Sequence, residues 1–220
     1  MPALLNSLQI VCAQLSLKTE IIVVNDHSTD QTPNIAREAG ISLLDLPVNC
    51  GIGAAMQTAF TYAVDKKFDF AMQIDGDGQH PPIEIQKLIQ AQQQSKADVI
   101  IGSRFIEKKG YQSSTLRRIG INYLSLLNRI YTSKRIEDTT SGFRLYNKKA
   151  LLLVAENYPD EYPEPQSIID FHKAGLSVKE VPVLMAERQG GQSSIRNFNQ
   201  LYYLFKVTIA MFFSFIRNKK

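Results

Sequence analysis

Cysteine and histidine are scarce in this sequence of 220 residues, which contains two of the former and three of the latter. Cys12 and Cys50 lack the spacing of a metal cluster and follow no signal peptide, so we expect a protein of the reducing cytosol. The histidines, His27, His80 and His172, are too scattered to predict a zinc site. No basic stripe with interleaved aromatic residues occurs, which argues against a nucleic-acid partner.

The sequence also lacks repeats, low-complexity linkers and the composition of a disordered chain. Hydrophobic residues make up 44% and charged residues 21% of it, which is enough for a single well-cored domain. The formal net charge is +4, and the excess is local. Such clusters suit phosphates or an anionic membrane surface, and a solvated basic face is the common alternative. The basic residues concerned are Arg117, Arg118, Arg129, Lys134, Arg135, Arg217, Lys219 and Lys220.

Strand-like and helix-like runs alternate along the first half of the chain. This alternation predicts an α/β fold with a mostly parallel open sheet flanked by helices. Gly40 is a typical helix stop and Pro81 with Pro82 a typical helix start. After residue 102 the pattern becomes irregular. The expected strands cover residues 20–25, 41–46, 68–75, 98–101, 143–146 and 176–185, and the expected helices cover residues 31–39, 52–66, 81–94 and 116–131.

The most informative stretch is an apolar run that ends in two carboxylates, Asp75 and Asp77. It places both acids in a turn at the carboxyl end of a strand, where open α/β sheets bind ligands. Mg²⁺ or Mn²⁺ is commonly held by one or two carboxylates, with water and substrate phosphates completing the coordination. The pair therefore predicts a divalent metal site, and ordinary turn chemistry is the alternative. Pro81, Pro82 and the lack of an acid at the twelfth position argue against a calcium loop.

Two other strand ends carry polar or small residues. The strand at residues 21–24 runs into Asp26, which is placed to accept a hydrogen bond from a nucleobase or ribose. Ser28, Thr29 and Asp30 fit equally well as caps of the following helix. The small residues at 49–55 open the next helix, where they allow close packing or the approach of a phosphate.

The C-terminal segment, residues 201–216, is apolar apart from Lys206 and a few hydroxyl groups, and basic residues follow it. A helix of this length rises about 24 Å, which is short of the roughly 30 Å of a bilayer core. Its aromatic residues and basic end predict a helix that lies on an anionic membrane surface rather than spanning it. A core-packing or dimer helix is the alternative.

The order of six motifs resembles family 2 glycosyltransferases, and most closely the branch of dolichol- and polyprenyl-phosphate sugar transferases. The resemblance implies a GT-A fold, which we expect to cover residues 1–195, and the apolar and basic C-terminal helix that the composition predicts covers residues 196–220. The resemblance also implies an inverting transfer from a nucleotide-activated sugar, with Mg²⁺ or Mn²⁺ as cofactor. The motifs are residues 24–30, 49–55, 75–82, 102–105, 140–144 and 188–194.

The resemblance assigns the donor site residue by residue. Asp75, Asp77 and Gln79 would hold the metal and the diphosphate, and Asp26 would contact the nucleoside. The shared motifs leave UDP-, GDP- and dTDP-sugars open as donors, because the choice depends on the shape of the pocket.

Basic residues complete the implied site. Arg104 and Arg144 would clamp phosphates, which a guanidinium binds in bidentate fashion, and surface ion pairing is the alternative. Arg188 and Ser193 match the loop that closes over the diphosphate or the acceptor in the family.

Two acids are candidates for the catalytic base. Asp138 matches an acidic residue that lies near the sugar in polyprenyl-phosphate transferases, and Glu164 lies where many other members carry their base. A phosphate acceptor is already ionised, whereas a sugar hydroxyl needs a carboxylate within hydrogen-bond reach. Glu164 also fits the first turn of a helix, where an acid favours the helix dipole.

One departure from the family concerns the start of the chain. Members normally begin with a strand that forms part of the nucleotide pocket, whereas residues 1–8 resemble the helix after that strand, so we expect the first strand to be absent. Three hypotheses follow: a transferase to polyprenyl phosphate or another lipid-linked acceptor on the cytoplasmic face of the membrane, a polysaccharide-chain transferase, or a truncated non-catalytic relative that binds only nucleotide or membrane. A homodimer is a further possibility.

Overall fold

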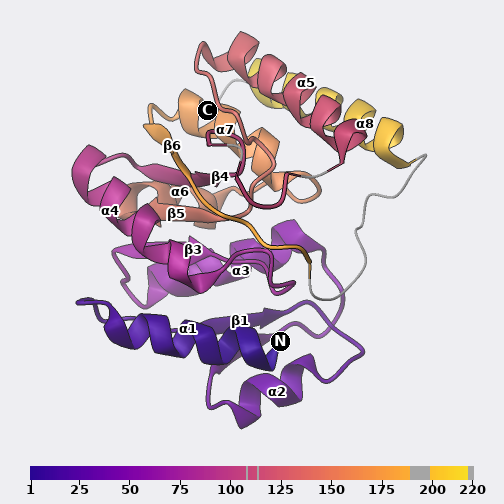
Figure 1. Cartoon of the computed structure of the whole chain (residues 1–220). Coiled ribbons are helices and arrows are strands. Elements are labelled where there is room, and N and C mark those ends of the chain that lie inside the picture. The colour runs from indigo at the N-terminus through magenta and orange to yellow at the C-terminus, as the bar shows by residue number, and fades with distance from the viewer. Residues whose placement is uncertain (108, 113, 189–198, 218–220) are drawn as a thin grey trace.

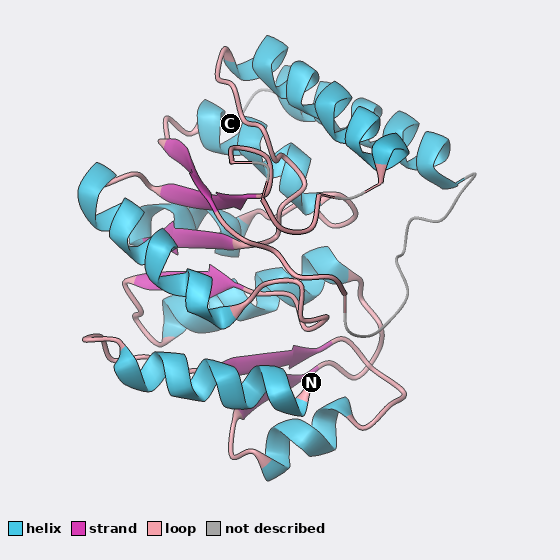
Figure 2. Ribbon diagram, viewed as in Figure 1, coloured by secondary structure: helices cyan, strands magenta, loops and turns pink. Residues whose placement is uncertain are grey.

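The strands of this computed structural model form two sheets. The structure describes residues 1–107, 109–112, 114–188 and 199–217. The smaller sheet pairs two strands in parallel, and the larger has the strand order β3-β5-β4-β6 (Figure 2). The strands are β1 Ile22–Asn25, β2 Ser42–Asp45, β3 Phe70–Gln73, β4 Val99–Ser103, β5 Arg144–Asn147 and β6 Val178–Pro182.

The direction of β5 is the exception in the predicted mostly parallel sheet. β5 runs antiparallel to both β3 and β4, while β4 and β6 are parallel. Arg144, the first residue of β5, pairs with Gln73 of β3 and with Ile101 of β4. The long connection from β4 thus returns the chain to the edge where β3 and β4 end. The segment before β5 consequently lies beside the turn that follows β3.

Helices cover both faces of these strands (Figure 1). Leu5 of α1 and Leu88 of α4 pack with Ile100 on one face. Phe60 of α3 and Leu151 of α6 are part of the cluster on the opposite face. Both faces are apolar, as an α/β fold requires. The helices are α1 Pro2–Gln14, α2 Thr32–Glu38, α3 Ile52–Asp65, α4 Ile85–Ser95 after the short η1 Pro82–Glu84, α5 Thr115–Thr132, α6 Lys148–Glu156, α7 Pro163–Lys173 and α8 Asn199–Ile216.

The C-terminal helix α8 packs on α5 and α7. Val207 and Met211 are fully buried there, in a cluster with Leu124 of α5 and Ile169 of α7. Lys206, the charge within the apolar segment, lies 3.1 Å from a carboxylate oxygen of Glu161. One face of α8 therefore serves as a core-packing surface, which was the alternative interpretation of this segment.

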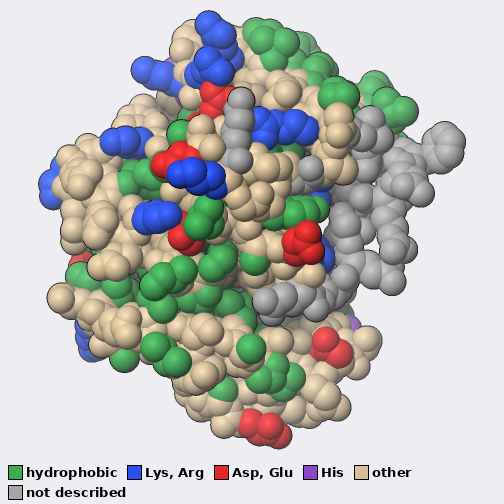
Figure 3. All heavy atoms as spheres, in the orientation of Figure 1, with side chains coloured by type: hydrophobic (Ala, Val, Ile, Leu, Met, Phe, Trp, Pro, Cys, Tyr) green, Lys and Arg blue, Asp and Glu red, His purple; other side chains and the backbone are tan. Residues whose placement is uncertain are grey.

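The other face of α8 stays apolar and exposed. Leu201, Phe205 and Phe213 have exposed fractions of 75%, 64% and 59%, and Leu126 and Ile130 of the neighbouring α5 are exposed too. Figure 3 shows hydrophobic side chains along the upper right edge, where α5 and α8 lie. In the described part of the chain, no helix is long and apolar enough to cross a membrane.

The start of the chain is helical. α1 comes before β1, and α3 packs against both β1 and β3, although these two strands belong to different sheets. Within the described residues, no strand pairs with the second edge of β1 or of β3. The expectation that a first strand is absent from the protein remains a prediction.

Candidate active site

The two carboxylates of the candidate metal site follow β3 directly. The Asp77 carboxylate accepts a hydrogen bond of 2.9 Å from the backbone N–H of Gln79, and the Asp75 backbone N–H donates to Nδ1 of His80 at 3.0 Å. Gly78 has a φ of +79°, which glycine adopts without strain and which lets the turn form. These local bonds hold both acids at the carboxyl edge of the larger sheet.

The segment before β5 approaches this turn closely at Gly142. A β-carbon placed there would lie 2.9 Å from Oδ1 and 3.2 Å from Oδ2 of Asp75. Only glycine fits this contact without displacing the carboxylate. The motif at residues 140–144 and the Asp75 turn, far apart in the sequence, therefore meet at one edge of the sheet.

Charge and burial at this turn perturb two ionisable groups. Burial and the neighbouring charge of Asp77 raise the pKa of Asp75 to about 6, although its side chain remains 38% exposed. Burial lowers the pKa of His80 to about 4, so the imidazole is neutral and acts as an acceptor. Its ring stacks on Phe143 with centroids 4.9 Å apart. Two close carboxylates that repel one another are a site for a cation.

The donor set fits a divalent metal that shares its coordination with a substrate. In the residues that the structure describes, no group of three or more His, Cys, Asp or Glu side chains could hold a metal, so the candidate ligands there are the carboxylates of Asp75 and Asp77. Mg²⁺ is typically bound in this way, by one or two carboxylates plus phosphates. A cation already occupies one of them, because a guanidinium nitrogen of Arg188 lies 2.9 Å from Oδ2 of Asp77. The predicted ligand role of the Gln79 side chain remains a prediction.

Arg104 forms a buried bidentate ion pair with Asp138. Its Nε and Nη2 atoms lie 2.7 and 2.6 Å from the two carboxylate oxygens, and its backbone N–H also donates to Asp138. Glu180 of β6 holds the same loop, since its carboxylate accepts the backbone N–H groups of Glu137 and Asp138. Asp138 is fully buried and thus committed to Arg104.

Arg144 lies inside the protein rather than on the surface. It is fully buried, and its guanidinium donates to Ser167 Oγ and to the backbone oxygens of Ser141, Thr139 and Glu164. These bonds join the segment before β5 to the start of α7. A contact of Arg144 with phosphate, as predicted from the sequence, would require some of them to break.

Glu164 lies at the start of α7, in the first turn, as its helix-dipole interpretation predicted. The side chain is half-buried, and its Oε1 accepts a hydrogen bond of 3.4 Å from Gln73 Nε2. Burial raises its pKa, Arg144 opposes that rise, and the charge of Asp75 adds to it. Glu164 therefore belongs to the same acidic group as Asp75, whereas Asp138 does not.

Asp26 contacts the helix that the small residues open. Its two carboxylate oxygens accept the backbone N–H groups of Cys50 at 2.6 Å and of Gly51 at 2.9 Å. The carboxylate thus caps the N-terminal end of α3, where an acid also complements the helix dipole. The predicted contact of Asp26 with a nucleoside remains a prediction. Ser193 lies outside the described residues.

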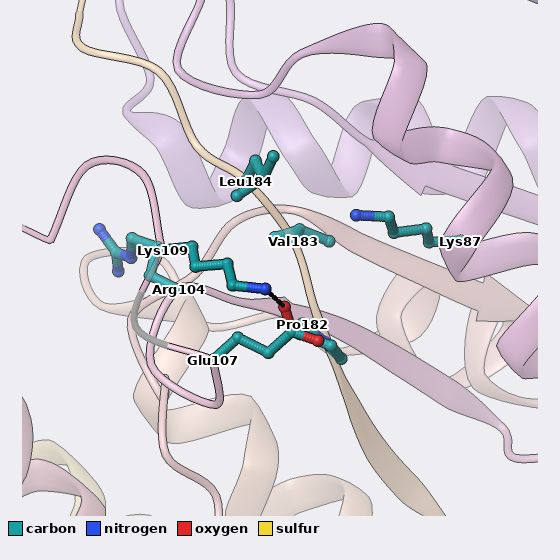
Figure 4. Close-up of a pocket in the computed structure, with 7 residues that line it drawn as sticks. All are labelled: Lys87, Arg104, Glu107, Lys109, Pro182, Val183 and Leu184. Carbon is teal, nitrogen blue, oxygen red and sulfur yellow. Dashed lines mark ion pairs between the residues drawn. The ribbon is translucent and has the colours of Figure 1, made fainter.

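The structure adds two arginines from the start of α5. Burial and the charge of Arg104 lower the pKa of Arg117, and its guanidinium has no ion pair within the described residues. The guanidinium of Arg118 lies 3.7 Å from the ring centroid of Phe105. The sequence indicated this basic stretch but not its proximity to Arg104. Arg104 also lines a small hollow, in which Lys109 pairs with Glu107 (Figure 4).

The carboxylate pair after β3 and the helix-covered sheets define an α/β fold of the GT-A type, and the sequence comparison agrees. The model of the family described as "Glycosyl transferase family 2" matches residues 2–153. This range is more than half of the chain. The chain belongs to glycosyl transferase family 2.

Curated relatives place the chain near one branch of that family. It is 27% identical over 217 residues to polyprenol monophosphomannose synthase of Mycolicibacterium smegmatis, covering 94% of this chain and 80% of that protein. It is 26% identical over 187 residues to undecaprenyl-phosphate mannosyltransferase of Micrococcus luteus, covering 81% and 76%. The predicted resemblance to polyprenyl-phosphate sugar transferases is confirmed.

Solved structures support the fold. Glucosyl-3-phosphoglycerate synthase from Mycobacterium tuberculosis, in complex with phosphoglyceric acid, matches with a TM-score of 0.70 and 21% identity, over 97% of this chain and 75% of that one. The same enzyme in complex with Mn²⁺ and UDP-glucose matches with a TM-score of 0.68 and 19% identity. At these identities the likeness is one of fold.

Proposed function

We propose that this protein transfers a sugar from a nucleotide-sugar to a polyprenyl phosphate or another lipid-linked acceptor, in a reaction that needs a divalent metal. The observation that carries the proposal is the pair Asp75 and Asp77 at the end of β3, with a guanidinium of Arg188 already on Asp77. The relatives that act on polyprenyl phosphates, by their names, support the acceptor class.

At the donor site, Asp75 and Asp77 would hold Mg²⁺ or Mn²⁺, with Gln79 beside them. A divalent metal held there would supply positive charge to stabilise the leaving diphosphate. Arg188 moves from Asp77 to the diphosphate, where Ser193 adds a hydroxyl donor. Asp26 follows β1 and contacts the nucleoside of a UDP-, GDP- or dTDP-sugar. A protein of the related fold has been solved with UDP-glucose, which supports a nucleotide-sugar as the class of donor.

At the acceptor site, the cations around Arg104 receive the lipid phosphate. Arg117 has no anionic partner in the described structure and lies near Arg104, so an incoming phosphate would relieve their repulsion. A phosphate acceptor is ionised at neutral pH and needs no base. Asp138 then serves to hold Arg104, and Arg144 serves to hold the segment that contacts Asp75.

The apolar face of α5 and α8 lies next to this cationic group and docks on the membrane. Interfacial helices bind through exposed apolar residues together with basic ones, and Arg217 follows α8 directly. The protein is then peripheral on the cytoplasmic face, where the lipid-linked acceptor is presented. A homodimer formed through the same face is the competing arrangement.

Glu164 favours a second candidate, a transferase that extends a polysaccharide chain. A sugar hydroxyl must lose a proton, and Glu164 is an acid with a raised pKa next to the Asp75 group, as a general base requires. Under this candidate, Glu164→Gln abolishes transfer, whereas under the lipid-phosphate candidate it leaves transfer to polyprenyl phosphate largely intact.

The first test is calorimetric titration of the protein with UDP, GDP and dTDP, each with and without Mn²⁺, next to the Asp77→Ala variant. Metal-dependent binding of one nucleotide that the variant loses would support the donor site. The acceptor is then tested by transfer of the labelled sugar to polyprenyl phosphate in detergent. No binding of any nucleotide would overturn the transferase and leave a non-catalytic relative.

A further inference from the structure

Gln73, the last residue of β3, is a buried polar side chain with partners on both ends of its amide. It is 2% exposed and pairs in the sheet with Arg144 of β5, the strand next to β3 in Figure 1. Burying an amide without hydrogen bonds costs free energy of folding, so the hydrogen-bond partners of Gln73 indicate its role. Nothing in the sequence pattern of this strand requires a glutamine at its end.

Two tyrosines fix the orientation of this amide. Its Oε1 atom accepts the hydroxyl of Tyr146 at 3.3 Å and that of Tyr158 at 3.4 Å. Burial raises the pKa of both tyrosines, so both hydroxyls stay protonated and donate. The opposite orientation would turn the amide oxygen toward carboxylates, which only accept hydrogen bonds. The NH₂ group of Gln73 is therefore directed toward the acids of the site.

Two carboxylates receive that NH₂ group. Nε2 of Gln73 donates to Oε1 of Glu164 at 3.4 Å. The same Nε2 atom and Oδ1 of Asp75 each lie 2.9 Å from the point where a β-carbon of Gly142 would be, and Gln73 acts on the Asp75 carboxylate as a hydrogen-bond donor. An amide NH₂ has two N–H donors, which matches two carboxylates. The NH₂ group of Gln73 therefore serves as a common hydrogen-bond donor to the metal-site acid, Asp75, and to the candidate base, Glu164.

We propose that Gln73 is a positioning residue, which holds the carboxylates of Asp75 and Glu164 together at the metal site while Tyr146 and Tyr158 keep its amide from flipping. This inference rests on the proposed donor site. Hydrogen bonds to a metal-binding carboxylate orient it, and their loss typically weakens metal binding by about 10- to 100-fold.

The chain offers variants that separate positioning from packing. Gln73→Leu removes the amide and with it one acceptor of two buried hydroxyls, so it also destabilises the fold. The triple variant, which adds Tyr146→Phe and Tyr158→Phe, replaces all three polar partners by apolar groups and restores most of the stability. Phe60→Leu is the packing control, because the apolar Phe60 ring packs against both tyrosine rings, with centroids 4.9 and 5.1 Å apart.

The measurement is the Kd for Mn²⁺ by calorimetry, with the nucleotide that the unmodified protein binds, together with the thermal unfolding midpoint of each variant. We expect Gln73→Leu and the triple variant to bind Mn²⁺ about 10-fold or more weakly, although the triple variant is nearly as stable as the unmodified protein. Phe60→Leu should unfold at a lower temperature yet bind Mn²⁺ within about twofold of normal.

Unchanged Mn²⁺ affinity in the triple variant would overturn the role of Gln73, even if Gln73→Leu alone fails to fold. If Phe60→Leu and the triple variant lost Mn²⁺ affinity equally, the effect would be one of packing, and this result would also overturn the role of Gln73. Failure of the unmodified protein to bind Mn²⁺ with any nucleotide is a different result, because it removes the proposed function itself and this role with it.

Discussion

Arg188 and Asp77 form an ion pair of 2.9 Å at the carboxylate that we assign to the metal. The guanidinium and a metal ion compete for the same oxygen. We predict that Arg188→Ala strengthens Mn²⁺ binding to the nucleotide-free protein by about fivefold, since a partly exposed ion pair is worth roughly 1 kcal/mol. With a nucleoside diphosphate bound, Arg188→Ala should instead weaken Mn²⁺ binding, because the diphosphate then lacks the guanidinium as a cationic partner.

Lys109→Ala is the matched control for this prediction, since Lys109 is an exposed cation that pairs with Glu107. It should leave both Mn²⁺ affinities unchanged. The measurement is calorimetry with Mn²⁺, with and without the bound nucleotide. Weaker Mn²⁺ binding by Arg188→Ala in both states would contradict the competition between Arg188 and the metal.

The contact of Gly142 with Asp75 gives a second prediction. In Gly142→Ala the added methyl would lie 2.9 Å both from the Asp75 carboxylate and from Nε2 of Gln73, so both side chains must then move. We expect a loss of stability of about 1–3 kcal/mol and at least about a tenfold loss of Mn²⁺ affinity. Gly76→Ala in the same turn meets no atom within 4 Å and should fold normally. Normal Mn²⁺ binding by Gly142→Ala would contradict the expectation that metal binding depends on the position of the Asp75 carboxylate.

The sequence predicted the position of the acids better than their surroundings. Asp75 and Asp77 follow an apolar strand, and a strand end with its turn is decided by adjacent residues, so their place was predictable. The contacts of Gln73 come from Tyr146, Tyr158 and Glu164, which are 73 to 91 positions away. A single sequence contains no signal for such pairs, and the amide was missed.

The lack of a signal for contacts between distant residues also explains the other differences between the predicted and the observed structure. The segment at residues 143–146 was predicted as a strand, but its direction depends on the path of the long connection before it, so the antiparallel pairing of β5 was not foreseen. The residue type of Arg144 predicted a phosphate clamp, whereas its environment, a fully buried site with protein acceptors, is set by α7 and by the loop before β5.

The pKa of Asp75 gives a prediction about stability. Its value of about 6 in the folded protein lies above the ordinary 3.8, so between these values the folded state binds more protons than the unfolded state. Stability therefore falls as the pH rises through this window, and the full cost is present above pH 6. Without metal, Asp75→Asn should unfold at a higher temperature than the unmodified protein well above pH 6.

Near pH 3.8 the two proteins should unfold at about the same temperature, because Asp75 is then protonated in the folded state. The measurement is the thermal unfolding midpoint against pH in the presence of a chelator. Asp26→Asn is the control, since its carboxylate is bonded to backbone N–H groups and its loss should destabilise the protein at neutral pH. A destabilised Asp75→Asn at neutral pH would contradict the electrostatic cost assigned to Asp75.

The buried pair of Arg104 and Asp138 gives a prediction that separates stability from binding. Asp138→Ala leaves Arg104 buried without its partner and should cost about 3–5 kcal/mol of the free energy of unfolding. The double variant Arg104→Met, Asp138→Leu should regain part of that loss, because apolar residues replace buried ion pairs well, while the backbone N–H of residue 104 loses its carboxylate acceptor. If Arg104 contributes to the phosphate site, the double variant is more stable than Asp138→Ala but no longer transfers sugar to polyprenyl phosphate. Transfer at the normal rate would remove Arg104 from the site.

The exposed apolar face of α8 binds either a membrane or a second copy of the chain, and two substitutions on this face distinguish these alternatives. Phe205→Ser combined with Phe213→Ser removes two side chains that are 64% and 59% exposed, so the fold should be unaffected. We expect the variant to lose flotation with vesicles that contain anionic lipid, while the unmodified protein floats and releases at high salt. Ile83→Ser, at a residue 66% exposed on η1, is the control and should float normally. If neither the unmodified protein nor the control floats, and the serine variant alone changes a dimer to a monomer in sedimentation, the face is a dimer interface instead.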